Sequence, residues 1–212
     1  MTRMQRFGTG KRESHDASGF YDRKMMKTSN VEIVEDLREK GGGWSNKIYC
    51  GSSELMTELP NSSIALTFTS PPYNVGKEYD DDLSFSEYTD MLARVMRKIY
   101  IATFSGGRLA INVANLGRKP MIPMTQIVYN IANDVGFLPV AEIIWQKAEG
   151  SNGSCAWGSW NSAKSPQMRD IHEYVLIFAK DLYGRPDKGE STMTKEEFMQ
   201  STLSVWQIRP ES

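Results

Sequence analysis

The 212 residues contain few cysteines and no long apolar run. Cys50 and Cys155 are the two cysteines, and they are too far apart in the sequence to form a disulfide framework or a metal-binding cluster. No apolar stretch approaches the ~18 residues that a membrane span needs, and the polar residues 1–11 lack the apolar segment of a signal peptide. These absences argue against a secreted disulfide scaffold and an integral membrane protein. We therefore expect a cytoplasmic protein that binds neither a metal nor a membrane.

The sequence also lacks an excess of charge of either sign. Lys and Arg number 25 against 26 Asp and Glu, for a formal net charge of −1. The total charge therefore gives no attraction to nucleic acid, although a local basic face is compatible with a neutral total. With 40% hydrophobic and 24% charged residues, the composition is that of a globular chain rather than a disordered one. The length suits one domain with a substantial core.

By composition the chain divides into an arm and a larger domain. Residues 1–46 are interpreted as an irregular N-terminal arm with a short helix over residues 31–39, followed by three consecutive glycines. The first 28 residues hold seven basic and three acidic side chains, which fits either a solvated terminus or an arm that contacts phosphate. From residue 47 onward strands and helices alternate, so we place one domain over residues 47–212.

The alternation of apolar strands and capped helices predicts an α/β domain. Strands are expected over residues 47–50, 64–69, 108–113, 140–145 and 174–178, and helices over residues 53–59 and 122–134. Two more helices are expected to begin after Ser84 and Thr194, because each is followed three residues later by a Glu that completes a capping box. This order is typical of a largely parallel sheet covered by helices on both faces.

One segment differs from an ordinary turn, the run Ser70-Pro71-Pro72-Tyr73 directly after the strand predicted over residues 64–69. Two consecutive prolines fix φ at both positions and keep the residues before them extended. Neither proline carries an N–H group, so the loop offers carbonyl acceptors and almost no backbone donors. In an open parallel sheet, ligands bind outside the carboxyl ends of the strands, which is where this loop is expected.

A stiff loop with a hydroxyl, carbonyl oxygens and an aromatic ring suits the binding of an exocyclic amino group on a flat heterocycle. The amino nitrogen of cytosine or adenine is a poor nucleophile, because its lone pair is delocalised into the ring. Acceptors aimed at its two N–H groups favour a pyramidal nitrogen that can attack an electrophilic methyl group, while Tyr73 stacks on the base. A base in a duplex must first be flipped out of the stack. Taken without its sequence context, the four-residue segment is equally compatible with an ordinary turn that ends a strand.

Four segments of the sequence form a set that is more specific than any one of them. They are residues 64–74, which include the loop and the strand before it, and residues 106–113, 169–180 and 204–208. Together they resemble the amino-methyltransferases of DNA, which modify N4 of cytosine or N6 of adenine. The resemblance runs from about residue 47 to residue 212. It implies the catalytic part of a Rossmann-like methyltransferase sheet with helices on both faces.

The resemblance implies a role for each residue of the loop. Ser70 and Pro71 would bind the target amino group, Pro72 would hold the loop, and Tyr73 would stack on the base. Relatives with Ser at the first position most often act on N4 of cytosine, whereas Asp or Asn there usually marks adenine-N6 enzymes. A site-specific cytosine-N4 enzyme in a restriction–modification setting is therefore favoured, and adenine stays an alternative. Methylation of an amide nitrogen in protein is a third hypothesis. The enzymes that carry it out have Asn at the first position of the loop, so Ser70 argues against it.

The methyl donor of this family is S-adenosylmethionine, and the resemblance implies donor contacts at Ser52, Thr69 and Asn74. Ser52 stands where relatives often carry Asp. The glycine-rich donor loop of the family, roughly Asp-Pro-Phe-x-Gly-Ser-Gly, has no counterpart in this sequence. We therefore expect an incomplete fold, which a missing C-terminal half or a second polypeptide would complete. A non-catalytic DNA-binding fragment is the alternative to an enzyme.

Double-stranded DNA is the expected partner, with a target-recognition region that begins near residue 150. Residues 150–169 form a long segment rich in Ser, Gly, Asn and Trp, and loops of that length are usually functional or disordered. Trp157 and Trp160 suit stacking on bases or wedging into a duplex, and suit equally well the covering of a sheet edge. Lys164 and Arg169 are candidate phosphate contacts, although scattered surface charges are more often simply solvated.

Overall fold

The computed structural model describes residues 43–73, 83–117, 120–147, 164, 170–186 and 189–209. Contacts divide the chain into two units, Met1–Val31 and Glu32–Ser212, and every described residue belongs to the second. The predicted arm and the helix predicted over residues 31–39 lie outside the described residues. The described residues fall almost entirely within the domain that was expected from residue 47.

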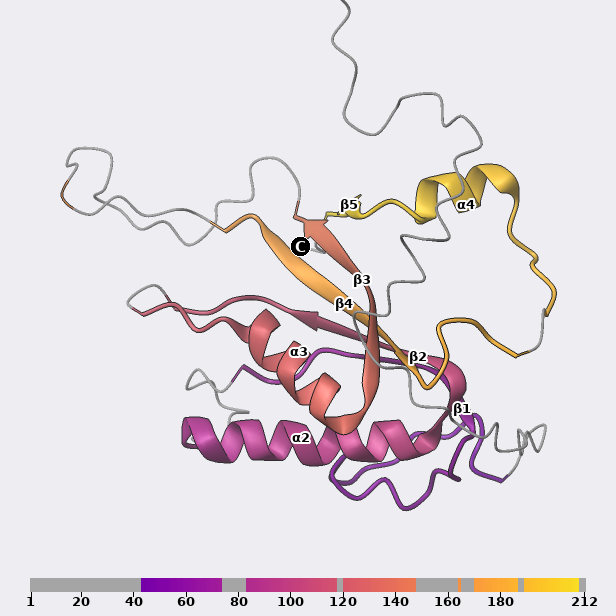
Figure 1. The fold of residues 1–212 in the computed structure, drawn as a ribbon, viewed down its shortest axis with the longest axis horizontal. Helices are drawn as coiled ribbons and strands as arrows, with labels where there is room; N and C mark the ends of the chain where they lie inside the picture. Colours follow the sequence, from indigo (N-terminus) through magenta and orange to yellow (C-terminus); the bar gives the residue numbers. More distant parts are fainter. Residues whose placement is uncertain are drawn as a thin grey trace, which may run out of the picture. The chain divides into compact units, whose positions relative to one another are not determined.

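A mixed five-stranded sheet forms the centre of the domain (Figure 1). Its strands are β1 (Ile64–Thr69), β2 (Thr103–Val113), β3 (Phe137–Gln146), β4 (His172–Lys180) and β5 (Val205–Gln207), in the order β1-β2-β4-β3-β5. β1 pairs with β2 and β3 with β5 in parallel, whereas β4 is antiparallel to both of its neighbours. The α/β prediction is confirmed. The sheet is less parallel than expected. Parallel neighbours need a crossover connection, usually a helix, and no helix is described between β3 and β4, which pair antiparallel.

The helices α2 (Phe85–Ala102) and α3 (Met124–Val135) lie next to each other on one face of the sheet, where they enclose the main core cluster (Figure 1). Each contributes the buried residues of an amphipathic stripe, such as Leu92 and Met96 of α2 and Val128 of α3. A third helix, α4 (Lys195–Ser201), has no buried residue. None of the helices in the described part is long and apolar enough to cross a membrane.

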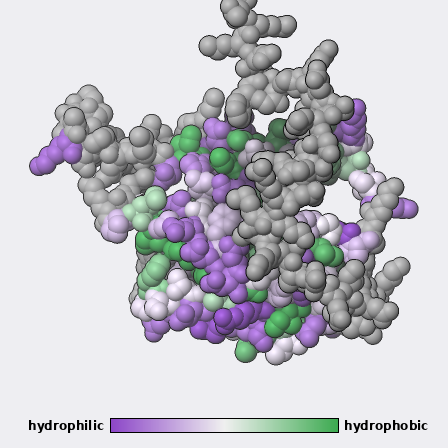
Figure 2. Space-filling model, in the orientation of Figure 1, coloured by the Kyte–Doolittle hydropathy of each residue, from purple (hydrophilic) through white to green (hydrophobic). Residues whose placement is uncertain are grey.

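The opposite side of the sheet, called here the second face, carries a smaller cluster. Its buried members are Ala110, Ile143 and Val175, with Ile177 and Trp206 packed against them. On β1, Leu66 and Phe68 are 58% and 65% exposed, and they are in register with Arg108 and Ala110 of β2. β1 thus contributes apolar side chains to the second face without being covered there. On the face drawn in Figure 2, the described hydrophobic side chains lie in scattered groups among hydrophilic ones.

Two of the predicted elements are wrong. Residues 47–50 form no strand, and Ile48 is fully exposed. Residues 53–59 form two successive turns rather than a helix, with hydrogen bonds from Leu55 to Ser52 and from Leu59 to Met56. Met56 has φ +44°, a left-handed conformation that interrupts a right-handed helix.

The strand expected over residues 108–113 begins five residues earlier, at Thr103. Gly106 and Gly107, a pair typical of a break between elements, lie within this strand. A Cβ at Gly106 would lie 2.6 Å from the Gly184 carbonyl oxygen, and φ there is +80°. Glycine is therefore required for a close approach inside the sheet rather than for a break in the chain.

Candidate active site

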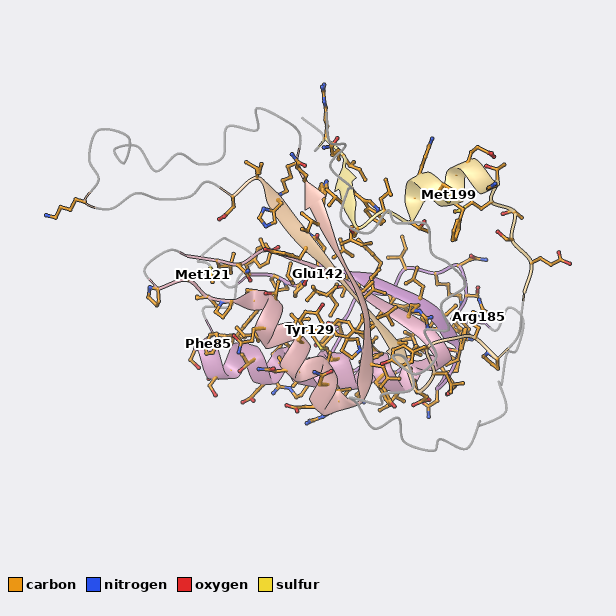
Figure 3. The ribbon with its side chains drawn as sticks, turned by 45° about the horizontal axis from the view of Figure 1, so that its top comes forward. Phe85, Met121, Tyr129, Glu142, Arg185 and Met199 are labelled. Carbon is orange, nitrogen blue, oxygen red and sulfur yellow. The ribbon has the colours of Figure 1, made fainter. Side chains whose placement is uncertain are left out.

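The loop Ser70-Pro71-Pro72-Tyr73 leaves β1 at the carboxyl end of the parallel strands. Ser70 and Pro72 are exposed, whereas Pro71 and Tyr73 are half-buried. In Figure 3, Phe85 marks the first turn of α2 near this end of the sheet, and Arg185 lies at the other end. The Ser70 hydroxyl is therefore accessible at the sheet edge where α/β folds bind their ligands.

Two tyrosine hydroxyls hold the loop in place. The Tyr73 hydroxyl accepts a hydrogen bond from the Ala114 N–H, just beyond β2, at 2.9 Å, and the Tyr73 ring packs against the main core cluster. Tyr88 of α2, which is 3% exposed, donates its hydroxyl to the Pro72 carbonyl oxygen at 2.6 Å. One lone pair of the Pro72 carbonyl is thus used within the protein. The predicted grip on an amino group falls to the Ser70 hydroxyl and the Pro71 carbonyl.

The polar contact of Tyr88 was not predicted from the sequence. Tyr88 lies in the amphipathic stripe of α2, and its ring is buried in the main core cluster. Helical periodicity says nothing about a hydroxyl that reaches a residue 16 positions earlier in the sequence. Tyr73, expected to stack on a base, is also part of the packing under the loop. Stacking on its remaining face stays a prediction.

Beside the loop lies a cavity of about 550 Å³, within the range of small-molecule sites. Ser52 and Pro72 both line it, so the structure brings a predicted donor contact next to the predicted catalytic loop. The rest of the wall comes from the residues around Ser52 and from the first turns of α2. Ser52 is exposed, and its Oγ accepts the Glu54 N–H at 3.3 Å.

The charged groups that line this cavity are mostly acidic. Three carboxylates, those of Glu54, Glu87 and Asp90, face one guanidinium, that of Arg94. Arg94 forms an ion pair with Glu54, and this hydrogen bond raises the pKa of Arg94. The Ser84 hydroxyl and backbone N–H, hydrogen-bonded to Glu87 in the capping box, lower the pKa of that carboxyl. Both groups therefore stay charged at neutral pH, and the lining favours a ligand with positive charge.

The remaining predicted residues are placed only in part. Thr69 is the half-buried last residue of β1, and Lys164 is exposed. Asn74, Trp157, Trp160 and Arg169 lie outside the described residues. Their predicted contacts with the donor or with DNA stay predictions.

A polar group that the sequence did not reveal lies at the carboxyl end of β2. Asn112 Nδ2 donates to Glu173 Oε2 of β4 at 2.7 Å, and Lys147 Nζ forms an ion pair with Glu173 Oε1. The nearby His172 has Nε2 2.9 Å from the Tyr174 hydroxyl, a contact within β4 that is typical of a structural histidine. In the sequence, the only sign of this group is an Asn between apolar residues of a strand. Among the described residues, no three His, Cys, Asp or Glu side chains are grouped to hold a metal ion.

Comparison with known proteins identifies the family. Residues 64–210 match the family model described as DNA methylase, N6_N4_Mtase. The Type II methyltransferase M.MjaVI of Methanocaldococcus jannaschii is 38% identical over 162 residues, which are 74% of this chain and 83% of that protein. The chain therefore belongs to the DNA methylase family that modifies N4 and N6 amino groups.

Two solved structures agree in fold. The DNA modification methylase TTHA0409 of Thermus thermophilus, solved with S-adenosyl-L-methionine, has a TM-score of 0.58 and 22% identity over 74% of this chain. PvuII DNA methyltransferase, cytosine-N4-specific, has a TM-score of 0.56 and 18% identity over 77% of this chain. The matched parts are 66% and 57% of those two chains. The predicted Rossmann-like methyltransferase fold is confirmed.

Proposed function

We propose that this chain carries the catalytic loop of a site-specific DNA methyltransferase that moves a methyl group from S-adenosylmethionine to N4 of a flipped cytosine. The observation that carries the proposal is the anchored loop itself. Tyr88 and Ala114 hold it at the carboxyl end of β1, while the Ser70 hydroxyl stays exposed. Positioning of this kind supplies a large part of the rate when two substrates must meet in attack geometry.

In the reaction, the Ser70 hydroxyl and the Pro71 carbonyl accept the two N–H groups of the target amino nitrogen. The nitrogen lone pair attacks the methyl carbon of the donor, the sulfonium sulfur leaves with the C–S electron pair, and the amino group then loses a proton to solvent. This direct transfer needs neither a metal nor a covalent enzyme intermediate. Tyr73 would contribute by stacking on the flipped base, an interaction worth about 1–3 kcal/mol.

The cavity next to the loop is the proposed seat for part of the donor. S-adenosylmethionine carries a positive sulfonium and a positive ammonium group, and the acidic lining of the cavity complements them. Ser52 at its wall and Thr69 and Asn74 around the loop are the proposed donor contacts. The related Thermus thermophilus methylase binds the same donor, which supports this assignment.

The choice of cytosine rests on Ser70 and on the specificity of the PvuII enzyme, which shares the fold. Cytosine and adenine both present an amino group beside a ring nitrogen, so adenine is the second candidate base. We further propose a completing polypeptide segment that bears the glycine-rich donor loop, and DNA contacts from Trp157, Trp160, Lys164 and Arg169.

The test is incubation of the completed enzyme, which is this chain together with the polypeptide segment that bears the glycine-rich donor loop, with unmethylated phage DNA and tritiated S-adenosylmethionine, followed by mass spectrometry of the nucleosides. Label in N4-methyldeoxycytidine is the expected result. Label in N6-methyldeoxyadenosine would change the base and keep the chemistry. Binding of DNA with no calorimetric binding of the donor would favour the non-catalytic DNA-binding alternative.

A further inference from the structure

The segment that follows β2 is a loop closed by an antiparallel bridge. Residues 114–123 are called here the bridged loop, and the structure describes all but two of them. Leu116 and Ile122 exchange two backbone hydrogen bonds, of 3.0 and 2.6 Å, and both side chains pack against the main core cluster. Gly117 has φ +66°, and a Cβ there would lie 3.0 Å from a carbonyl oxygen across the turn. The loop is therefore tight and anchored in the core, with Met121 just beyond the bridge.

Two further hydrogen bonds fix the bridged loop beside the proposed catalytic loop. The Ala114 N–H donates to the Tyr73 hydroxyl at 2.9 Å, which joins the two loops directly. Asn115 Oδ1 accepts the Thr125 N–H at 3.1 Å and so caps α3, whose N-cap residue is a proline without a polar side chain. β1 and β2 are parallel, so both loops leave the same edge of the sheet. The bridged loop is thus a stiff projection next to Ser70.

Met121 is an apolar side chain that the bridged loop presents to solvent. It is 56% exposed, whereas Leu116 and Ile122 in the bridge are half-buried. Figure 3 shows Met121 at the same end of the sheet as Phe85 in the first turn of α2, and away from Arg185. An exposed methionine therefore stands on a rigid support at the edge where the target base is proposed to bind.

The reach of the bridged loop matches the depth of a DNA groove. Met121 lies about three extended residues beyond Ala114, where the loop is bonded to Tyr73, and this corresponds to about 10 Å. The two grooves of B-DNA are about 7.5 and 8.5 Å deep. A duplex whose target base occupies the loop around Ser70 therefore has its base stack within reach of Met121.

We propose that Met121 enters the base stack and fills the gap that the flipped target base leaves. The proposal deepens the proposed function and rests on it. A flipped base loses its stacking on both sides and its pairing, and this cost must be offset while the duplex is open. Apolar side chains, methionine among them, insert between base steps in proteins that kink DNA. Methionine is unbranched and flexible, so it fits an irregular gap, and its insertion removes exposed apolar surface from water. Met121 is thus a positioning residue that keeps the duplex open while Ser70 holds the amino group.

The test compares rates of methyl transfer by the completed enzyme on two short duplexes that carry its target site, mapped by sequencing the phage DNA that it methylates. One duplex is fully paired, and the other has an abasic nucleotide opposite the target base, which is then already unpaired. On the paired duplex, Met121→Ala should lower the rate about tenfold, which corresponds to about 1.4 kcal/mol. On the unpaired duplex, its rate should stay within about twofold of the unchanged enzyme, because little opening is left to stabilise.

Two further variants control for shape and for surface exposure. Met121→Leu keeps an apolar wedge and should stay within about twofold of the unchanged enzyme on both duplexes. Met199→Ala is the same truncation at a 61% exposed position of α4 and should change neither rate.

Two results would overturn the inference and leave the proposed function intact. The first is an equal loss of rate on the two duplexes in Met121→Ala, which would indicate a structural role. The second is an unchanged rate of this variant on the paired duplex. Absence of methyl transfer by the unchanged enzyme on both duplexes would instead overturn the inference and the proposed function together.

Discussion

At the scale of single residues, the Tyr88 hydroxyl is the contact that ties the proposed catalytic loop to α2. Tyr88→Phe keeps the buried ring and removes only the bond to the Pro72 carbonyl. We expect a loss of about 1 kcal/mol in the free energy of unfolding and a clear fall in the rate of methyl transfer.

Tyr100→Phe is the matched control for this change. Tyr100 donates to Asp181 Oδ1 at 2.6 Å, at the end of the sheet away from the loop. Removal of this hydroxyl should lower the free energy of unfolding by a similar amount and leave the rate of methyl transfer unchanged. Equal transfer rates in the two variants would show that the hydroxyl of Tyr88 serves packing only.

Tyr100 also predicts how stability depends on alkaline pH. Burial, together with the hydrogen bond to Asp181, raises the pKa of Tyr100 above its ordinary value of 10.0. The unfolded chain therefore releases this proton above about pH 10, while the folded chain keeps it. The stabilisation is complete below that pH and is lost as the pH rises toward the higher pKa of the folded state.

Urea unfolding at pH 9 and pH 11 measures this dependence. The free energy of unfolding should fall between the two, and the fall should be smaller in Tyr100→Phe. Part of the fall should remain in that variant, because the pKa of Tyr129 is also raised. The causes are burial and the nearby Glu142, whose carboxylate accepts the Tyr129 hydroxyl (Figure 3). An identical fall in both proteins would contradict the role given to Tyr100.

At the scale of elements, the capping box at the start of α2 supports the catalytic loop indirectly. Ser84 Oγ accepts the Glu87 N–H, and Glu87 in turn accepts from the Ser84 N–H at 2.9 Å. Ser84→Ala should destabilise the protein by about 1 kcal/mol and loosen the turn that carries Tyr88. Ser86→Ala, inside the first turn, should cost much less. Thermal unfolding of the two variants, together with their transfer rates, measures the difference.

The edge strand β1 predicts an association behaviour. Among the described residues it pairs only with β2, and it exposes Leu66 and Phe68 on the second face. Edge strands with exposed apolar side chains tend to pair with other chains, and a lysine on the edge strand opposes this pairing. Sedimentation velocity of the isolated chain should therefore show concentration-dependent association that Phe68→Lys reduces. Phe198→Lys, at an exposed position of α4, should not reduce it, and a monomer at all concentrations would contradict the prediction.

The elements that the sequence predicted well are those with strong local signals. β1 has its predicted bounds because a largely apolar run is followed, one residue later, by two prolines, and α2 begins where the capping box places it. The elements predicted wrongly, over residues 47–50 and 53–59, are short apolar patterns of which the structure leaves Ile48 and Leu55 exposed, while Met56 packs against the main core cluster. Local pattern alone does not distinguish such segments from regular elements.

The candidate site was predicted where its residues are consecutive and missed where they are not. The loop from Ser70 to Tyr73 is visible in the sequence, because the chemistry of proline acts on neighbouring residues. The bond between Asn112 and Glu173 joins residues 61 positions apart. Its partners are set by the antiparallel register of β2 and β4, which periodicity does not specify.

At the scale of the whole molecule, the account depends on Ser70 as an acceptor for the amino group that receives the methyl. The most direct measurement is the rate of tritium transfer to DNA by the completed enzyme with Ser70→Ala or with Ser63→Ala, each compared with the same enzyme without a substitution. Ser63 lies just before β1, where its hydroxyl donates to the Pro60 carbonyl at 2.7 Å, away from the loop. The account predicts that Ser70→Ala lowers the transfer rate about tenfold or more with DNA binding unchanged, and that Ser63→Ala leaves the rate as it is. Equal rates for both variants would contradict it.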